Sequence, residues 1–381
     1  MKNLVICIVL AVVASVVLVG CWHESDPRLA CAEAVMESQP DSALRIVSAI
    51  NPDEFSDARN LALFGLLSTQ ARVKCDIPID DDSLIDASVG YFREHGPDSN
   101  LMKSCFYLGY VRSGLGMYAM AVEPLTEAME LAGLERDDYW AAKATEALGD
   151  IFEQAYCYAE AVNYTEKAAM HYLKAGKERN HLFSMCDLSF RKFKNRETKD
   201  GLRLIDSVLF EAKRDSIDKA LVIYVNSYRY AMGMGAKDVG VATSSMKELE
   251  KYGYHFTPQD RLWKSLLELY KGNDAETARV IDSLSHSSLS LASTITYYKV
   301  LGEYCKKNND LKGELFCIDT LIKLQNQEVH RVMKQSVSLP QRNYYHKFSE
   351  REAERANRTL HLLFVIGFGL IVVSVYYTHI L

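Results

Sequence analysis

The sequence predicts an all-α fold, and two observations carry the prediction. No proline occurs between Pro124 and Pro258, and a proline inside a helix costs about 3 kcal/mol. The same interval is rich in Ala, Leu, Glu, Lys and Tyr and lacks the alternating Val, Ile and Thr runs of strands. The composition, 48% hydrophobic and 25% charged, supplies enough apolar material for a continuous core. The net charge of -6, with Lys and Arg interspersed among acidic residues, predicts no nucleic-acid partner.

The first 20 residues have the pattern of a secretory signal. A positive start, Met1-Lys2, precedes the apolar core Leu4–Val19. The sequence that closes this core, Leu18-Val19-Gly20-Cys21, resembles the bacterial lipoprotein processing box, in which cleavage occurs before the cysteine and lipids are attached to it. We therefore expect a lipoprotein-type signal peptide at 1–20 and lipidation of Cys21. The alternative is an uncleaved membrane anchor with a chance cysteine.

Helix signals follow from residue 26 to residue 95. Asp41 or Ser42 can cap a helix that follows Pro40. The segment Cys75–Asp82 contains a proline and consecutive acidic residues, so it is expected to be a loop. The predicted elements are a short helical hairpin at 26–50, a longer amphipathic helix at 57–74 and a partner helix at 83–95, which ends at Gly96-Pro97.

The stretch Cys105–Ala128 predicts a tight pair of antiparallel helices. Leu108-Gly109 lies in the first helix, residues 116–118 form the turn, and Ala121 and Ala128 line the second. Small residues at such positions let two helix backbones approach closely. The order Leu-Gly, Gly-x-Tyr, Ala and a second Ala seven residues later resembles the helix hairpin of tetratricopeptide (TPR) repeats.

The same pattern returns at intervals of about 40 residues and weakens along the chain. Two more degenerate hairpins are expected between the copies, at 218–252 and 257–285. The resemblance implies a TPR-like superhelical solenoid of antiparallel helix pairs over residues 21–335, with a period longer than the TPR length of about 34 residues. The recurring positions are Leu148-Gly149, Tyr158, Ala161 and Ala168, then Leu188-Ser189 and Gly201, and finally Leu301-Gly302.

The C-terminal end carries a second membrane signal. Leu360–Tyr377 is mostly apolar, lacks Asp, Glu, Lys and Arg, and would reach roughly 27 Å as a helix. We expect a transmembrane helix at 360–379 after a charged juxtamembrane helix at 336–359; the alternative is a buried core helix. Basic residues before the span favour cytoplasmic repeats, whereas the signal sequence favours periplasmic ones. Because large translocated domains largely ignore local charge, we favour a bacterial inner-membrane protein whose repeats face the periplasm.

The sequence shows no arrangement typical of a catalytic or metal site. It has no Cys-x-x-Cys, no His-Glu-x-x-His, no Gly-rich phosphate loop and no Gly-x-Ser-x-Gly elbow. We therefore expect no enzymatic activity, no metal and no cofactor. His171 and His181 flank a helix break, where a solvated or capping role is expected. The odd number of cysteines left after processing argues against an obligate disulfide framework, and Cys105, Cys157, Cys186 and Cys305 are expected to be small packing residues.

The resemblance to TPR proteins also implies a binding surface. In such solenoids the first helix of each hairpin lines a concave groove that holds extended or helical peptides. The alternative is that the aromatic residues pack between repeats and the charged ones only solvate a helix face. The positions that the resemblance implies for the groove are Lys103, Phe106 and Tyr110; Lys143, Glu146, Asp150 and Glu153; Phe183, Phe190 and Phe193; and Lys299, Glu303 and Lys306.

Together, the signal, the repeats, the charged helix and the single span resemble the membrane-anchored TPR regulators of Bacteroidetes. In those proteins a cytoplasmic coiled coil and an output domain usually follow the span, whereas this sequence ends at Leu381. The expected function is that of a non-catalytic sensor or adaptor that binds a protein or peptide and whose output lies in another polypeptide or has been lost. The alternative is a structural envelope scaffold lipoprotein without a signalling role.

Overall fold

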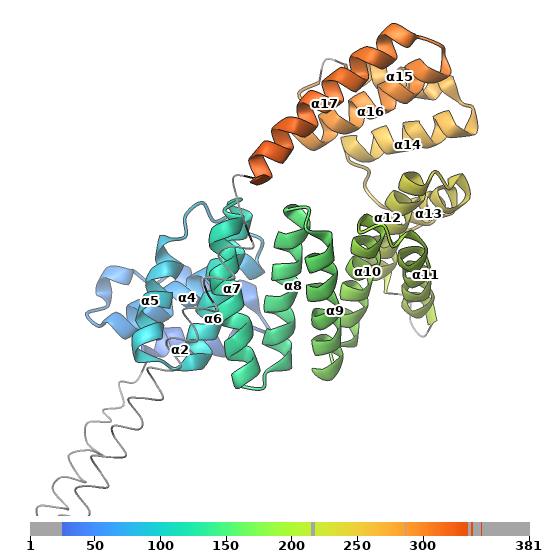
Figure 1. Ribbon diagram of the computed structural model, residues 1–381. Helices are drawn as coiled ribbons and strands as arrows, with labels where there is room; N and C mark the ends of the chain where they lie inside the picture. Colours follow the sequence, from blue (N-terminus) through green and yellow to red (C-terminus); the bar gives the residue numbers. More distant parts are fainter. Residues whose placement is uncertain (1–24, 215–217, 286, 334–336, 338–343, 345–381) are drawn as a thin grey trace, which may run out of the picture. The chain divides into compact units, whose positions relative to one another are not determined.

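The computed structural model describes residues 25–214, 218–285, 287–333, 337 and 344 (Figure 1). Within these residues, every regular element is helical, which confirms the predicted all-α fold. The predicted signal peptide, Cys21 and the predicted transmembrane helix at 360–379 lie outside the described residues, as does all but two residues of the predicted juxtamembrane helix. Among the helices of the described ranges, none is both long enough and apolar enough to cross a bilayer.

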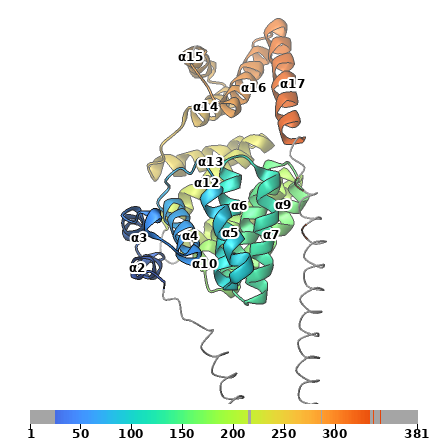
Figure 2. The same cartoon turned by 90° about the vertical axis from the view of Figure 1, so that its left-hand side faces the viewer.

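The chain divides into two compact units between Val111 and Arg112. In the first unit, α4 packs against α2, α3 and α5 (Figure 2). Asp57 caps α4, because its side chain accepts a hydrogen bond of 2.8 Å from the backbone N–H of Asn60. The helices of this unit are α2 (Pro27–Val35), α3 (Pro40–Ser48), η1 (Pro52–Glu54), α4 (Ala58–Lys74), α5 (Ser83–His95) and most of α6 (Asp98–Gly114).

The second unit begins as a regular array of helices. Five helices of 17 residues follow one another, and each begins 20 residues after the previous one. Two helices therefore occupy 40 residues, which confirms the period predicted from the recurring small residues. Consecutive helices of the array pack against each other. They are α7 (Tyr118–Leu134), α8 (Asp138–Gln154), α9 (Tyr158–Lys174), α10 (Glu178–Lys194) and α11 (Thr198–Arg214).

Six less regular helices follow in the described part of the second unit. They form three pairs, α12 with α13, α14 with α15 and α16 with α17, and the hairpins predicted at 218–252 and 257–285 are the first two of them. A shared core holds the pairs together, with Met234 from α12, Leu266 from α14 and Val300 from α16. The helices are α12 (Lys219–Ala236), α13 (Val239–Lys251), α14 (Pro258–Lys271), α15 (Asp274–Leu284), α16 (Leu291–Lys307) and α17 (Leu311–Met333).

Three-residue turns keep the 20-residue register. The middle residue of each turn has a positive φ, between +57° at Arg136 and +73° at Gly116, with Tyr156, Gly176 and Arg196 in between. This conformation costs a residue other than glycine roughly 1 kcal/mol. Three of these five turns nevertheless lack glycine, so the turn glycine of the first copy is not a marker of the repeat.

A proline inside α7 leaves one backbone carbonyl without its helical partner. Pro124 has no N–H, so it cannot bond the carbonyl oxygen of Met120 four residues earlier. The guanidinium of Arg112 lies 3.5 Å from that oxygen and donates to it instead. The helix begins at Tyr118, so the proline does not delay its start.

Gly201 marks a close approach of α10 and α11. A Cβ atom at this position would lie 2.6 Å from the carbonyl oxygen of Ser189 and 3.0 Å from the backbone nitrogen of Phe193. Because these neighbours are backbone atoms, they cannot swing away. The small residues of the third copy, Ser189 and Gly201, therefore keep the close packing expected for the repeat.

Gly201→Ala should destabilise the second unit by about 1–3 kcal/mol, because the added methyl group forces α10 and α11 apart. Denaturant unfolding followed by circular dichroism would measure the loss. Gly133→Ala in α7 is the matched control, since its Cβ would meet nothing within 4 Å, and it should leave stability unchanged or slightly raised. Equal effects of the two substitutions would contradict the close approach at Gly201.

Candidate functional site

Charged residues gather where α8 meets α10. Glu146, Asp150 and Glu153 lie at intervals of three and four residues on α8, and they share a network with Asp187 and Arg191 of α10. We call the four carboxylates, Glu146, Asp150, Glu153 and Asp187, the acidic cluster. The structure thus brings together three of the four side chains predicted from α8.

Arg191 is the centre of this network and is only 2% exposed. Its guanidinium donates to Asp150, to Glu153 at 2.8 Å and to Thr165 on α9. Gly149 makes the room, because a Cβ there would lie 2.7 Å from Nη1 of Arg191. The glycine of the Leu-Gly pattern therefore admits a buried cation as well as a neighbouring helix.

Glu146 is held by two neutral donors. The phenol of Tyr172 and the hydroxyl of Ser184 each donate a hydrogen bond of 2.8 Å to one of its carboxylate oxygens. The first donor comes from α9 and the second from α10, so Glu146 connects three helices. These two hydrogen bonds fix the position of Glu146, and neither of them comes from a charged group.

Asp187 accepts a hydrogen bond of 2.6 Å from the phenol of Tyr224 on α12. Burial raises its pKa to about 7, and the negative charges of Asp150 and Glu146 oppose the lowering effect of Tyr224 and Arg191. The side chain of Asp150 remains accessible to water. Partial loss of hydration beside the surrounding protein nevertheless raises its pKa to about 6, although the positive charge of Arg191 acts to lower it.

Aromatic rings continue the face from α10 to α12. The ring of Phe183 meets Tyr224 edge-on at 5.0 Å, and the ring of Phe190 lies 4.7 Å from that of Tyr228. Phe193 packs against the C-terminal end of α12, because a Cβ at Gly235 would lie 2.9 Å from its ring. All three phenylalanines are half-buried against the core between these helices, so they pack between repeats as well as bordering the face.

Three lysines follow the aromatic rings. Lys194 at the end of α10 and Lys237 after α12 both repel Lys299 on α16 electrostatically, and we call these three residues the lysine cluster. The surrounding protein and then the charges of Lys194 and Lys237 lower the pKa of Lys299, while Glu303 opposes the shift. Lys237 forms an ion pair of 3.4 Å with Glu303 of α16.

Aromatic rings also support two of these lysines. The ammonium group of Lys299 lies 4.9 Å from the centre of the Trp263 ring, and that of Lys194 lies 5.2 Å from Phe190. On α8, Lys143 sits 4.3 Å from the ring of Trp140. The predicted side chains Lys143 and Lys299 therefore both rest on aromatic faces rather than extending freely into water.

A surface hollow of about 440 Å³ lies between the C-terminal ends of α14 and α16. Glu303 and Lys306, both predicted for the groove, line it together with Tyr270. Lys307 closes one side, since its ammonium group bonds the carbonyl oxygen of Leu269 at 3.0 Å and the carboxylate of Asp274 at 2.5 Å. The structure thus places the last predicted residues beside the lysine cluster.

The remaining predicted residues belong to the first unit. Lys103 forms an ion pair of 3.6 Å with Glu33 of α2. Phe106 is buried and contacts the ring of Tyr107, whereas Tyr110 is exposed. All three residues therefore belong to the first unit, and the face of the second unit is formed by other residues.

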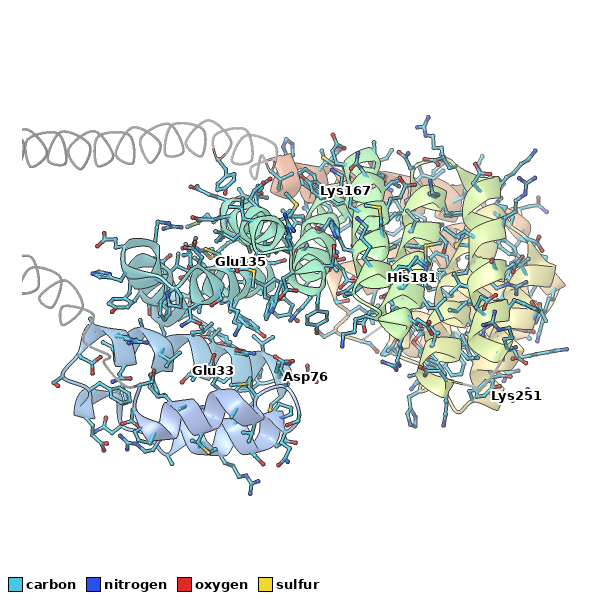
Figure 3. All side chains as sticks on the ribbon, turned by 90° about the horizontal axis from the view of Figure 1, so that it is seen from below. Glu33, Asp76, Glu135, Lys167, His181 and Lys251 are labelled. Carbon is cyan, nitrogen blue, oxygen red and sulfur yellow. The ribbon has the colours of Figure 1, made fainter. Side chains whose placement is uncertain are left out.

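The two histidines next to the helix break make local contacts. His181 of α10 points to α9, and its Nδ1 lies 2.8 Å from the carbonyl oxygen of Ala169 (Figure 3). His171 pairs with Asp138 of α8 at 2.7 Å. Both rings therefore join neighbouring helices of the array.

Several residues of the face were missed by the sequence analysis. Arg191, Asp187 and Lys194 lie on the same helical stripe as Phe183 and Phe190, at intervals of three and four residues. This spacing was available in the sequence, but the burial of an arginine was not. Tyr224, Tyr228, Lys237 and Trp263 come from hairpins too degenerate for their inner faces to be assigned.

The sequence matches no family model, and a comparison with curated proteins finds no match. Solved structures of similar fold exist at low sequence identity. Rap protein complexed with Competence and Sporulation Factor is 14% identical with a TM-score of 0.51, covering 87% of this chain and 98% of Rap. NprR in complex with its cognate peptide NprX is 11% identical with a TM-score of 0.53, covering 86% and 98%.

The apo form of the quorum sensor NprR from B. thuringiensis is 10% identical with a TM-score of 0.56, covering 85% of this chain and 97% of NprR. These values establish a likeness of fold along most of both chains. The protein therefore has a TPR-like all-helical repeat fold.

Asp187→Asn should change how stability depends on pH. The folded pKa of Asp187, about 7, lies above its ordinary value of 3.8, so its contribution to stability is present at low pH and is lost as the pH rises through 7. The Asn variant lacks this titration. The free energy of unfolding of the variant, relative to that of the wild type, should therefore be larger at pH 8 than at pH 5.5, as measured by urea unfolding.

The control is Asp200→Asn on the exposed side of α11, where the carboxylate is 65% accessible. Its unfolding free energy should follow that of the wild type between the two pH values. If the Asp187 variant behaved in the same way, the burial of that carboxylate would not be the cause.

Proposed function

We propose that the second unit binds an extended peptide segment along the face formed by α8, α10, α12 and α16. One observation carries the proposal: the acidic cluster and the lysine cluster occupy successive helices of this face, with half-buried aromatic rings between them. A peptide could satisfy both charged ends and place an apolar side chain in the middle.

The acidic end suits a cationic group. Four carboxylates face a single buried guanidinium, so Arg191 does not balance the negative charge. Burial is the main cause of the raised pKa values of Asp150 and Asp187, and the negative charges of the neighbouring carboxylates raise both pKa values further. A lysine, an arginine or an N-terminal amine of a ligand would supply the missing charge.

The basic end suits a carboxylate. Glu303 opposes the repulsion at Lys299, but its carboxylate is already paired with Lys237. The lowered pKa of Lys299 means that its positive charge is held at a cost. A ligand carboxylate would reduce that cost and form charge-assisted hydrogen bonds.

The structural likeness to NprR, which binds its cognate peptide NprX, supports a peptide as the ligand. From the sequence we further propose that the protein is non-catalytic, is lipidated at Cys21 and has a second membrane tether at 360–379. The repeats would then face the periplasm, and the protein would act as a sensor or adaptor for a peptide or protein in that compartment.

Lys299→Glu should weaken peptide binding about tenfold, because it removes a charge-assisted hydrogen bond and adds repulsion. The probe is an immobilised octapeptide library with Lys, Asp, Phe or Gly at each position. The wild type should select peptides in which an aromatic residue separates a basic residue from a carboxylate. Fluorescence anisotropy with a selected peptide then gives the dissociation constants.

Lys312→Glu is the matched control for this experiment. It makes the same charge change at an exposed position in the first turn of α17, and the dissociation constant should stay within twofold, or about 0.4 kcal/mol. The face is not the binding site if both substitutions weaken binding equally. Failure to select any peptide from the library would reject the proposed function.

Replacement of Cys21 should abolish the attachment of lipid to the protein. Cells that express the full chain would be fed an alkyne fatty acid, and the label on the protein would be detected after coupling to a dye. The wild type should be labelled, and Cys21→Ser should not, whereas Cys31→Ser should keep the label. If the wild-type protein carried no label, the prediction would be wrong and the alternative, an uncleaved N-terminal membrane anchor, would be favoured.

A further inference from the structure

Two cysteines of the last helix pair lie in direct contact. Cys305 stands near the end of α16 and Cys317 in the second turn of α17, and their exposed fractions are 7% and 0%. Both are free thiols in this structure. The thiol groups interact with each other, as each affects the proton affinity of the other.

The helix backbones approach closely at this point. A Cβ atom at Gly302 would lie 3.3 Å from the Cβ of Cys317, and one at Gly313 would lie 2.7 Å from the sulfur of Cys305. Glycine on each helix therefore faces the cysteine of the other. A disulfide requires two Cβ atoms only about 3.5–4.5 Å apart, which few helix pairs allow.

We propose that Cys305 and Cys317 form a disulfide bond that joins α16 to α17. This inference is independent of the proposed peptide binding. The other cysteines of the second unit do not share this arrangement: Cys186 lies in the core between α10 and α12, and Cys157 precedes α9.

The reaction is an exchange with a disulfide oxidant such as glutathione disulfide. The thiolate of one cysteine attacks the oxidant, and the first glutathione thiol leaves. The second cysteine then loses its proton and attacks the mixed disulfide, and the second glutathione thiol leaves. The two cysteines lose two electrons and two protons, and the oxidant becomes two thiols.

Burial determines when this exchange is fast. Loss of hydration and then the neighbouring thiol raise the pKa of Cys317 to about 11, and burial also raises the pKa of Cys305. The reactive thiolate is therefore scarce in the folded chain at neutral pH. The bond would form most readily before the helices close, and afterwards the same burial would shield it from reductants.

The bond would fix the part of α16 that borders the lysine cluster. Glu303, which pairs with Lys237, is two residues before Cys305, and Lys306 of the adjacent hollow is one residue after it. The bond would close a short loop around the turn between α16 and α17. Glu303 and Lys306 would therefore keep their positions even if the two helices separated at the end away from this turn.

The test is peptide mapping of the full chain under non-reducing conditions. The chain is purified without reductant, unfolded in urea, refolded with glutathione disulfide at pH 9 so that burial does not block the exchange, alkylated and cut with trypsin. Trypsin cleaves after Lys299 and Lys306 and after Lys312 and Lys323, so the two cysteines fall in different peptides. We expect a linked pair of peptides 300–306 and 313–323, whose mass is about 2 Da below the sum of the separate peptides and which disappears on reduction.

Two comparisons make the result decisive. Cys305→Ser should abolish the linked pair and leave Cys317 open to alkylation, while Cys186→Ser should leave the linked pair intact. The exposed thiol of Cys31 reports the progress of oxidation in the same sample. If both thiols are still free once Cys31 has reacted, or if each carries glutathione separately, the proposal is wrong.

Discussion

The burial of Arg191 between α8 and α10 is the interaction on which the polar face depends. A guanidinium that is 2% exposed has lost its hydration and needs carboxylates in fixed positions. Asp150 and Glu153, one turn apart on α8, provide them. Because Gly149 must be small for the cation to enter, the residue that lets two repeats pack closely also determines where the charge of the face lies. Close packing and the placement of charge are therefore coupled at one position of the repeat.

The 20-residue register places these groups opposite each other. From α7 to α11 each helix has the same length and the same three-residue turn, so equivalent positions recur on every second helix. Asp150 on α8 and Arg191 on α10 are 41 residues apart, about one period of the array. A change in helix or turn length between them would separate the ion pair. The identity of the turn residues matters less, since three of five turns have a residue other than glycine at the left-handed position.

Much of this fold could be predicted from the sequence. Recurring small residues and helical periodicity predicted the helices and the 40-residue period, because these signals depend on neighbours close in the chain. The cap predicted at Asp41 or Ser42 was wrong, since α3 begins at Pro40 with Gln39 as its N-cap. The face was predicted only in part. Glu146, Asp150 and Glu153 were identified from one repeat, whereas Arg191 appears in the sequence as an ordinary charged residue, and its burial depends on Gly149 on another helix. Contacts between degenerate repeats, such as Lys237 with Glu303, carry no local signal at all.

Along the face, the change from negative to positive charge occurs where the regular 20-residue spacing of the helices ends. After α11 the helices vary from 11 to 23 residues in length, so equivalent positions no longer recur at a fixed spacing. The position of α16 then depends on the core that Val300 shares with Met234 and Leu266. The ion pair between Lys237 and Glu303 cannot replace that core, because an exposed pair contributes less than about 1 kcal/mol. The apolar packing beneath the lysine cluster therefore holds it in place and offsets the electrostatic repulsion that Lys194 and Lys237 exert on Lys299.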